Sequence, residues 1–430
     1  MSKTVAAITL GCKVNAYDTE SVLERFRAAG YMVVDFSEEA DVYLVNTCTV
    51  TAAADRKSRQ KLRQAAARGG LVVVTGCYAQ NNPEEAMEIP GVHIVAGIKE
   101  RPEIVGFVEN YFQNGGITSR VTGYNKDRIT FDNMPAKGLE GRTRAFVKIQ
   151  EGCENFCSYC VIPMVRGPVR SRRLGDILRE IKDVAGLGGR EIVLTGISVA
   201  SYGLDLEGEK LADVLRAANV PGIERVRLSS IGPAAITPEF IEVFRENKVI
   251  CSHIHLSLQS GCDRTLEAMN RKYTCAQYAA AVQAIRLARP CTAVTTDIIA
   301  GFPGETEADF EESLEFVRSI AFADLHVFPF SPRKGTSAAS MPGQIPKKVK
   351  EERVRRMMDL GKKLKSGFIG ENLGKTAPVL FEKDDGPGQY AGFTPNYIEV
   401  IAESSEDIRG KVLEVRLEGS QDGRVIGVLI

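Results

Sequence analysis

Residues 151–160 read Glu151-Gly152-Cys153-Glu154-Asn155-Phe156-Cys157-Ser158-Tyr159-Cys160 and place three cysteines in a C-x3-C-x2-C run. The alternating apolar residues of Ala145–Ile149 predict a strand, so the cysteines should lie on the loop at its carboxyl end. Three thiolates this close together indicate a metal centre. A [4Fe–4S] cluster takes four ligands, so three cysteines would leave one iron open. Structural zinc is the alternative, but zinc ligands are usually spaced in pairs, and no histidine follows Cys160 before His253.

This run resembles the signature of the radical S-adenosylmethionine (SAM) enzymes. The resemblance implies that the open iron binds the amino and carboxylate groups of SAM. It also implies that one electron from the cluster cleaves SAM to a 5′-deoxyadenosyl radical. The aromatic residue before the third cysteine, Tyr159, is then expected near the SAM adenine.

The composition is that of an ordinary globular protein. The chain has 430 residues, enough for about two to four domains, and 44% of them are apolar. Its net charge is zero, so any nucleic-acid surface must come from local clustering. No apolar stretch reaches the roughly 18 residues that span a bilayer, and the N-terminus does not resemble a signal peptide. We therefore expect a cytoplasmic protein without a membrane partner, whose ten cysteines are reduced or bind metal.

Residues 1–112 alternate between strand and helix patterns, which indicates an α/β domain with a doubly wound parallel sheet. The expected strands are Val5–Leu10, Tyr31–Phe36, Val42–Asn46, Leu71–Thr75 and His93–Ala96, and the expected helices are Asp18–Ala29 and Ala53–Arg68. Cys12, Cys48 and Cys77 directly follow three of these strands. Because the carboxyl ends of parallel strands share one edge, we expect the three cysteines to converge there. Three buried packing thiols are the alternative.

The N-terminal pattern also resembles a known family. Gly-Cys-x-x-Asn at Gly11, Asn-Thr-Cys at Asn46 and Gly-Cys at Gly76, ahead of a radical SAM signature, are similar to the radical SAM methylthiotransferases. The resemblance covers nearly the whole chain. It implies that Cys12, Cys48 and Cys77 hold an auxiliary [4Fe–4S] cluster that carries sulfur, and that Cys153, Cys157 and Cys160 hold the SAM-binding cluster. Two SAM molecules would be used for each methylthio group.

Residues 113–140 show little periodicity and are interpreted as a linker. From 141 to 371 strands and helices recur, which indicates a radical SAM domain. The expected strands are Ala145–Ile149, Glu191–Thr195, Arg225–Ser229, His253–Leu258, Val294–Ala300 and Leu325–Phe328, and the expected helices are Asp176–Leu187, Pro238–Arg245, Thr274–Ala288 and Glu307–Ile320. Six such units suggest a partial (β/α)6 barrel with its site at the carboxyl ends of the strands.

Small or polar residues follow several of these strands and are suited to holding SAM. The predicted SAM contacts, besides Tyr159, are Thr195, Gly196, Ser229, Gln259 and Gly301. Ordinary strand-to-helix turns would explain each position separately. His253 and His255 share one strand face and are interpreted as core histidines, not ligands. Cys251, Cys262, Cys275 and Cys291 lack motif spacing and are interpreted as packing or incidental thiols.

Basic residues cluster locally in this neutral chain. The segment 333–365 contains eleven basic and three acidic residues, a net charge of +8. Two further clusters lie at 56–63 and just after the SAM cysteines. A charge run is usually only a solvated face, but three of them favour a polyanion such as RNA. The predicted nucleic-acid contacts are Arg166, Arg170, Arg172, Arg173, Lys347, Lys348 and Arg355.

Residues 372–430 contain short alternating runs separated by turns, which predicts a small antiparallel β-barrel. The expected strands are Ala377–Glu382, Tyr397–Ile401, Lys411–Leu417 and Gly423–Leu429. Its place and size resemble the TRAM domain, a substrate-binding barrel in this family. Acidic side chains outnumber basic ones in this segment, which is unusual for a phosphate binder.

Three branches of the family act on different substrates. They modify threonylcarbamoyladenosine in tRNA, isopentenyladenosine in tRNA, or an aspartate of a small-subunit ribosomal protein. Gly11–Asn15, Asn46–Thr51 and Phe393–Tyr397 are most similar to the first branch, whereas the acidic barrel would suit a basic ribosomal protein. The resemblance implies tRNA, an electron donor such as flavodoxin or ferredoxin, and an unidentified sulfur donor as partners. A non-catalytic two-cluster electron carrier is the alternative outside the enzymes.

Overall fold

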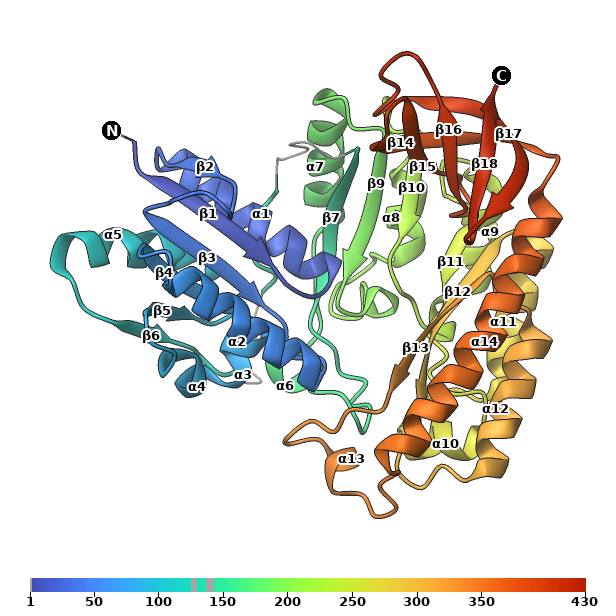
Figure 1. The fold of residues 1–430 in the computed structure, drawn as a ribbon, viewed down its shortest axis with the longest axis horizontal. Coiled ribbons are helices and arrows are strands. Elements are labelled where there is room, and N and C mark those ends of the chain that lie inside the picture. The colour runs from blue at the N-terminus through green and yellow to red at the C-terminus, as the bar shows by residue number, and fades with distance from the viewer. Residues whose placement is uncertain (1, 125–129, 137–142) are drawn as a thin grey trace.

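The computed structural model describes residues 2–124, 130–136 and 143–430, which form three packed units (Figure 1). An N-terminal parallel sheet faces the concave side of a curved central sheet, and a small barrel lies at one end of the central sheet. Parts of the expected linker, 125–129 and 137–140, and the first residues of the expected radical SAM domain, 141–142, lie outside the described residues. No helix in the described ranges is long and apolar enough to cross a membrane.

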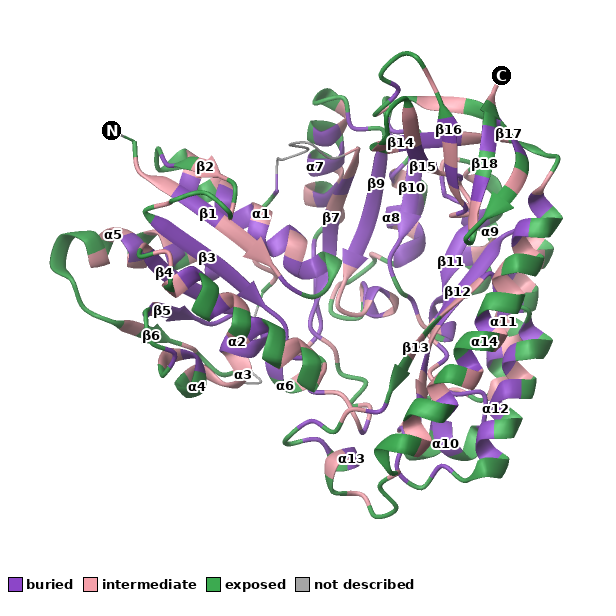
Figure 2. Cartoon of the chain, in the orientation of Figure 1, coloured by how far each residue is buried: buried purple, intermediate pink, exposed green. Residues whose placement is uncertain are grey.

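The N-terminal sheet is parallel and doubly wound, as the sequence predicts. Its strands run in the order β2-β1-β3-β4-β5-β6. Their bounds are β1 Thr4–Thr9, β2 Met32–Val34, β3 Val42–Thr47, β4 Leu71–Gly76, β5 Val92–Ala96 and β6 Thr118–Arg120. The helices are α1 Lys13–Ala28, α2 Ala52–Ala66, α3 Cys77–Asn81, α4 Pro83–Met87 and α5 Ile104–Asn114, with a short 3-10 turn, η1, at Arg101–Glu103. β3 and β4 are buried along their whole length (Figure 2) because helices cover both faces of the sheet.

Two features of this unit differ from the expectation. β6 lies inside the expected linker, and it pairs with β5 to form the edge of the sheet. The helices α3 and α4 have only five residues each, too few to show a helical period in the sequence.

The central sheet is the expected partial barrel of six parallel strands. Its strands are β7 Arg144–Glu151, β9 Glu191–Gly196, β10 Arg225–Leu228, β11 His253–His255, β12 Ala293–Ala300 and β13 Asp324–Pro329. The bridges Val226–Ile250 and Ile231–Leu256 connect its two halves. Helices pack on the convex side: α7 Leu174–Gly186, α8 Leu211–Ala217, α9 Pro238–Glu246, α11 Cys275–Ala288 and α12 Glu307–Ile320. The largest hydrophobic core lies between these helices and the sheet.

Shorter elements complete the central unit. They are α6 Ile162–Arg166, β8 Arg170–Ser171, η2 Val199–Ser201, η3 Pro233–Ala235, α10 Asp263–Ala268 and α13 Ser337–Ser340. β8 was not expected, and it pairs antiparallel with the end of β7. The basic segment contains one long helix, α14 Lys347–Asn372, which crosses the edge strand β13 and leads into the C-terminal barrel.

The C-terminal unit is a closed barrel in the order β14-β15-β16-β18-β17. Its strands are β14 Thr376–Gly386, β15 Gln389–Phe393, β16 Glu399–Glu403, β17 Val412–Gln421 and β18 Arg424–Leu429. β15 was missed because it begins directly after the turn-rich stretch that ends at Gly388. The barrel is not wholly antiparallel, since β16 and β18 pair in parallel to close it.

Candidate functional site

The C-x3-C-x2-C loop leaves the carboxyl end of β7, and backbone contacts fix its shape. Gly152 has φ +75°, and a Cβ there would lie 1.8 Å from the carbonyl oxygen of Pro168, so only glycine fits. The amide of Cys153 donates to the carbonyl of Gly167 at 3.0 Å. The loop is therefore held against the β7–β8 pair, with its cysteines at the strand ends.

Two of these sulfurs already accept hydrogen bonds. Arg271 donates to Cys157 Sγ at 3.2 Å, and the amide of Ile162 donates to Cys160 Sγ at 3.4 Å. Burial raises the pKa of Cys160 to about 12. The charges of Cys153 and Cys157 contribute to that rise, so the three thiols share one neighbourhood. Donors aimed at sulfur lower the cost of a buried thiolate or of a cluster bound to it.

The other three cysteines converge at the carboxyl edge of the N-terminal sheet. Cys12 is the N-cap of α1, Cys48 follows β3, and Cys77 opens α3 after β4. Gly11 has φ +101°, and a Cβ there would lie 3.0 Å from Cys48 Sγ, so glycine lets the Cys12 loop approach Cys48. Burial raises the pKa of Cys77 to about 12, and the charges of Cys12 and Cys48 act in the same direction. The three thiols therefore face one space.

The spacing of the sulfurs tests what these sites can hold. Among the described residues, two groups of three ligand atoms lie within 4.8 Å of one another, and neither contains any of these six cysteines. Sulfurs around one tetrahedral zinc, with Zn–S bonds of about 2.3 Å, would be roughly 3.8 Å apart. Both triplets are thus more open than a single-ion site. All-thiolate donor sets of this kind suit iron–sulfur clusters.

A buried ion network joins the two cysteine sites. Asp18 and Glu151 both contact the cations Arg101, Lys148 and Arg166. Arg166 lies 2.9 Å from Asp18 and 3.1 Å from Glu151, and its Nε donates to Cys77 Sγ at 3.3 Å. Three cations against two carboxylates leave one positive charge beside the Cys77 sulfur.

The network crosses the interface between the two units. Asp18 and Arg101 belong to the N-terminal unit, whereas Lys148, Glu151 and Arg166 belong to the central one. Burial raises the pKa of the Glu151 carboxyl, but Arg166, Lys148 and Arg101 together hold it well below its usual range. No sequence spacing links these five residues, so sequence reasoning missed the network.

Three of the predicted nucleic-acid contacts are wrong. Arg166, Arg170 and Arg172 are 0%, 4% and 2% exposed, respectively. Arg170 donates to the carbonyls of Arg166 and Pro168, and Arg172 pairs with Glu180. Charge patterning alone could not separate a surface cluster from this buried one.

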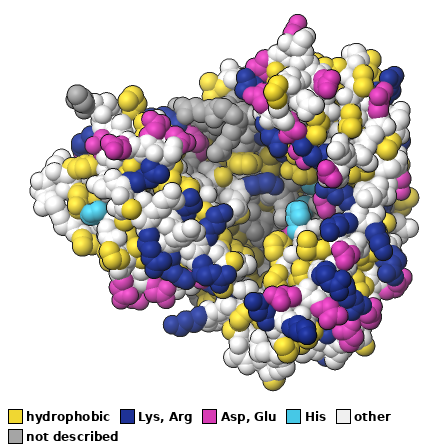
Figure 3. All heavy atoms as spheres, viewed as in Figure 1, with side chains coloured by type: hydrophobic (Ala, Val, Ile, Leu, Met, Phe, Trp, Pro, Cys, Tyr) yellow, Lys and Arg dark blue, Asp and Glu magenta, His cyan; other side chains and the backbone are white. Residues whose placement is uncertain are grey.

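The remaining predicted contacts are exposed. The side chains of Arg173, Lys347 and Arg355 are 63%, 90% and 68% accessible, and Lys348 is exposed. Lys and Arg side chains gather over α14 on one side of the central hollow and over α2 on the other (Figure 3). These two basic helices flank the hollow on this face of the molecule.

The predicted SAM contacts lie at or near the ends of four neighbouring strands. Thr195 and Gly196 end β9, Ser229 follows β10, and Gln259 forms a bridge to β12. Ser229 is buried, and its hydroxyl has no hydrogen-bond partner among the described residues, which suits a ligand contact. Gly301 differs, because the Lys350 side chain of α14 lies directly against it.

Neither Tyr159 nor the cysteines outside the motifs belong to the two triplets, and the Cys262 thiol donates to Asp309 at 3.5 Å. The Tyr159 ring packs edge-on against Phe302, with ring centroids 6.4 Å apart. Cys251 and Cys262 are buried, Cys275 is partly buried and Cys291 is exposed. None of these four lies in either triplet.

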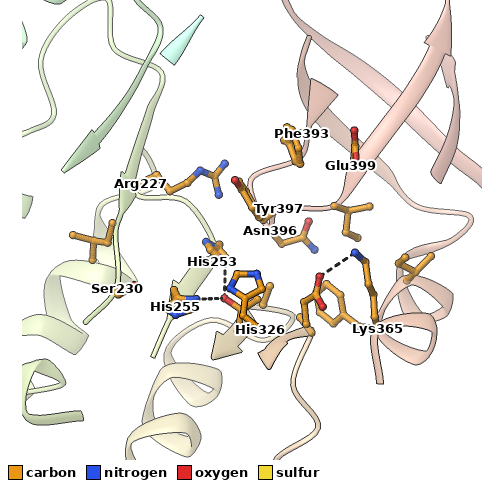
Figure 4. A pocket seen from close by; sticks show the side chains of 18 of the residues that line it. Arg227, Ser230, His253, His255, His326, Lys365, Phe393, Asn396, Tyr397 and Glu399 are labelled. Atoms are coloured by element: carbon orange, nitrogen blue, oxygen red, sulfur yellow. Dashed lines mark hydrogen bonds and ion pairs between the residues drawn. The ribbon is translucent and has the colours of Figure 1, made fainter. Parts of the chain in front are cut away.

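His253 and His255 are buried as expected, but they also line a cavity (Figure 4). Both imidazoles contact the Thr295 hydroxyl at 3.0 Å. The cavity measures about 270 Å³ and lies between β10–β13 and the loop of the C-terminal barrel that contains Asn396 and Tyr397. Sequence reasoning missed it because its walls come from all three units.

Comparisons with known proteins agree on both halves of this architecture. Residues 4–97 match the family described as "Uncharacterized protein family UPF0004", and residues 147–317 match the "Radical SAM superfamily". A relative from Bacillus subtilis (strain 168), "Threonylcarbamoyladenosine tRNA methylthiotransferase MtaB", is 40% identical over 96% of this chain and 93% of its own length. A relative of the same name from Aquifex aeolicus is 38% identical over 96% and 99%.

Other similar proteins have a different name or share only the fold. A Moorella thermoacetica relative, "tRNA-2-methylthio-N(6)-dimethylallyladenosine synthase", is 36% identical over 100% of this chain and 98% of its own. The solved structure of the radical SAM methyltransferase TsrM from Kitasatospora setae has a TM-score of 0.59 at 15% identity, covering 79% of this chain and 77% of that chain. At that identity the likeness concerns the fold alone.

Proposed function

This chain belongs to the radical SAM methylthiotransferase family, and we propose that it converts N6-threonylcarbamoyladenosine at position 37 of tRNA to its 2-methylthio derivative. The observation that carries the proposal is the convergence of two cysteine triplets on either side of one buried ion network. An electron carrier would need the cysteines, but not a strand-end cradle beside them. The family implies SAM and a [4Fe–4S] cluster as cofactors.

The residues of the C-x3-C-x2-C loop are assigned to the SAM-binding cluster. Cys153, Cys157 and Cys160 supply three thiolates, and Arg271 donates to one of them. A SAM-bound cluster held by these residues would supply the radical chemistry needed at an unactivated C–H bond, here C2 of adenine. Ser229, whose buried hydroxyl has no partner among the described residues, and Thr195 are assigned to hold SAM beside it.

The N-terminal triplet is assigned to a second, auxiliary [4Fe–4S] cluster that holds the sulfur to be transferred. Cys12, Cys48 and Cys77 would be its ligands, and Arg166 its hydrogen-bond donor. The excess positive charge of the ion network stabilises thiolates and an anionic cluster at this position. The network also fixes the N-terminal edge against the loop of the first cluster, so that both sites face one substrate space.

The exposed basic residues are assigned to tRNA. Lys347, Lys348 and Arg355 of α14, together with Arg173, present charge to the phosphate backbone without reading sequence. The cations of α2 lie across the hollow, so an anticodon stem could contact both sides while its loop enters. A tRNA substrate places the proposed reaction in the cytoplasm, with a low-potential protein of the flavodoxin or ferredoxin class as electron donor.

A second candidate substrate is dimethylallyladenosine, because relatives named for it are also similar over nearly the whole chain. Anaerobic reconstitution followed by nucleoside analysis separates the possibilities. We expect about eight irons and eight sulfides per chain, and a methylthio product only from tRNA that carries threonylcarbamoyladenosine. Product formed only from dimethylallyladenosine would contradict the substrate, whereas four irons would contradict the auxiliary cluster.

A further inference from the structure

The cavity between the central sheet and the C-terminal barrel has a distinct chemistry (Figure 4). Its deep wall is formed by His253, His255 and Thr295, and its floor by Asn396 and Tyr397. His253 is 6% exposed, and its Nδ1 has no hydrogen-bond partner among the described residues. An unpartnered buried nitrogen at a cavity wall indicates that a polar group completes the site.

Two of the three carboxylates that line this cavity are paired with cations. Asp324 pairs with Lys365 at 2.9 Å, and Glu399 contacts Lys383 and Arg424 at 3.4 Å. The remaining carboxylate, that of Asp297, lies 3.3 Å from nitrogen atoms of both His255 and His326. Asp324 and Glu399 are therefore not free to bind an added cation, whereas the ligand atoms of Asp297, His255 and His326 lie within 4.8 Å of one another.

Two of the lining cations are also paired, Lys365 with Asp324 and Arg227 with Glu191. Lys13 differs, because it is exposed and has no ion pair within the part of the chain that the structure describes. The His326 imidazole has only its Nδ1 engaged by Asp297, and its side chain is 58% accessible. Its other nitrogen is therefore available to a ligand. The unpaired Lys13 ammonium beside this free nitrogen favours a ligand that carries a negatively charged group.

We propose that this cavity binds the threonylcarbamoyl substituent of adenosine 37, with Lys13 and His326 contacting its carboxylate and His253 and Asn396 its hydroxyl or carbamoyl group. This proposal rests on the proposed function and names the subsite that distinguishes its substrate. A dimethylallyl group is hydrocarbon throughout. Buried here, it would leave His253 Nδ1 unpaired and desolvate Lys13 without compensation.

The position of the cavity agrees with this role. Lys13 directly follows Cys12, which is assigned to the auxiliary cluster. Asp297 lies within β12, four residues before Gly301, which follows the strand; four residues span about 13 Å at the usual strand rise. The cavity therefore lies on the amino-terminal side of the strand ends at which the SAM contacts are assigned.

The first experiment uses the reconstituted holoenzyme and three anticodon stem-loop RNAs. They carry threonylcarbamoyladenosine, dimethylallyladenosine or plain adenosine at position 37, and their affinity is measured by fluorescence anisotropy. We expect the wild type to bind the threonylcarbamoyl RNA about tenfold more tightly than the plain RNA, as a charge-assisted contact allows. Lys13→Met and His326→Phe should each lose most of that preference while binding the plain RNA normally. Lys248→Met removes an exposed lysine outside the cavity and serves as the matched control.

The second experiment changes the RNA, so its outcome does not depend on how a variant folds. Amidation of the threonine carboxylate should reduce the affinity of the wild type as much as the His326→Phe substitution does. The same amidation should reduce the affinity of the His326→Phe variant little further. A wild type that prefers the threonylcarbamoyl RNA, with variants that keep the full preference, would overturn the cavity proposal and leave the function intact. A wild type that forms product only on dimethylallyl RNA would overturn the function itself.

Discussion

Tyr397 of the C-terminal barrel stacks on His253 of the central sheet, with ring centroids 4.7 Å apart and ring planes 20° apart. Phe393 stacks on the other face of Tyr397 at 4.8 Å, and the Arg227 guanidinium lies 4.6 Å from the Tyr397 ring centroid. Tyr397 has φ +67°, a conformation that costs free energy in a non-glycine residue. The barrel therefore inserts a strained aromatic loop into the central sheet, and this loop forms the cavity floor.

Replacing this aromatic ring should weaken the junction. Tyr397→Ala removes two ring contacts and the cation–π contacts with Arg227 and Arg144 but keeps the strained backbone, so we expect a loss of about 2 kcal/mol. Tyr397→Phe retains the rings and serves as the matched control. Thermal unfolding measures both, and an equal melting temperature for Tyr397→Ala and the wild type would contradict the role of the stack.

Breaking the buried ion network should affect both stability and metal content. Arg166→Met removes hydrogen bonds to the buried carboxylates of Asp18 and Glu151, and each buried acceptor left unpaired typically costs about 1–3 kcal/mol. It also removes the donor to Cys77, so the variant should retain about half of the iron. Arg179→Met, at an exposed ion pair on α7, should change neither urea unfolding nor iron content. Full iron content in Arg166→Met would contradict the assigned role of the network at Cys77.

The two cysteine triplets should separate in function. Cys157→Ala removes a proposed ligand of the SAM-binding cluster, so both 5′-deoxyadenosine and the methylthio product should disappear. Cys48→Ala should abolish the product but leave measurable SAM cleavage. Chromatography measures the amounts of 5′-deoxyadenosine and of methylthio product formed in the same reaction. Cys291→Ala, at an exposed cysteine outside the triplets, is the control. Equal loss of both products in Cys48→Ala would refute the division of roles.

The pair formed by His326 and Asp297 should make stability depend on pH. The hydrogen bond to Asp297 raises the pKa of His326 above its usual 6.5. The pair therefore stabilises the fold fully below that value, and the contribution fades as pH rises through the raised pKa. The melting-temperature gap between wild type and His326→Gln should thus be larger at pH 6 than at pH 8.5. Burial lowers the pKa of His93, so His93→Gln should show the opposite trend.

The basic face of α14 should contribute to tRNA affinity electrostatically. Replacing Lys347, Lys348 and Arg355 with alanine should weaken tRNA binding and reduce the slope of log affinity against log salt by up to about 2.7. A matched triple variant at Arg179, Arg190 and Arg216 removes three exposed cations that have local acidic partners. Identical salt slopes for both triple variants would mean that α14 does not face the RNA.

The sequence predicted those parts of the molecule that depend on local pattern. Cys12, Cys48 and Cys77 could be brought together because each follows a strand of a sheet whose strands are parallel, which fixes the edge they share. Local alternation likewise predicted all six parallel strands of the central sheet. Short elements such as β8, with two residues, carry no such signal.

Features made by distant residues could not be predicted. Asp18 and Arg166 are 148 positions apart, and only the packed interface makes them partners. The same packing turned Arg166, Arg170 and Arg172 from expected surface charges into buried ones. The cavity needs walls from three units at once, so His253 could be recognised as buried but not as part of a binding site.

The ion network also limits how this protein can be recombined. In a chimera whose first 112 residues come from a relative, the relative supplies the residues at positions 18 and 101. Their partners Lys148, Glu151 and Arg166 still come from this chain. If the relative lacks the acid of Asp18 or the base of Arg101, the interface of the chimera buries a charge without its partner. The two halves should then fail to pack correctly, even if each folds alone. Substituting residues at the cavity rim should therefore be able to change the substrate of such an enzyme, whereas exchanging whole halves at their junction should not.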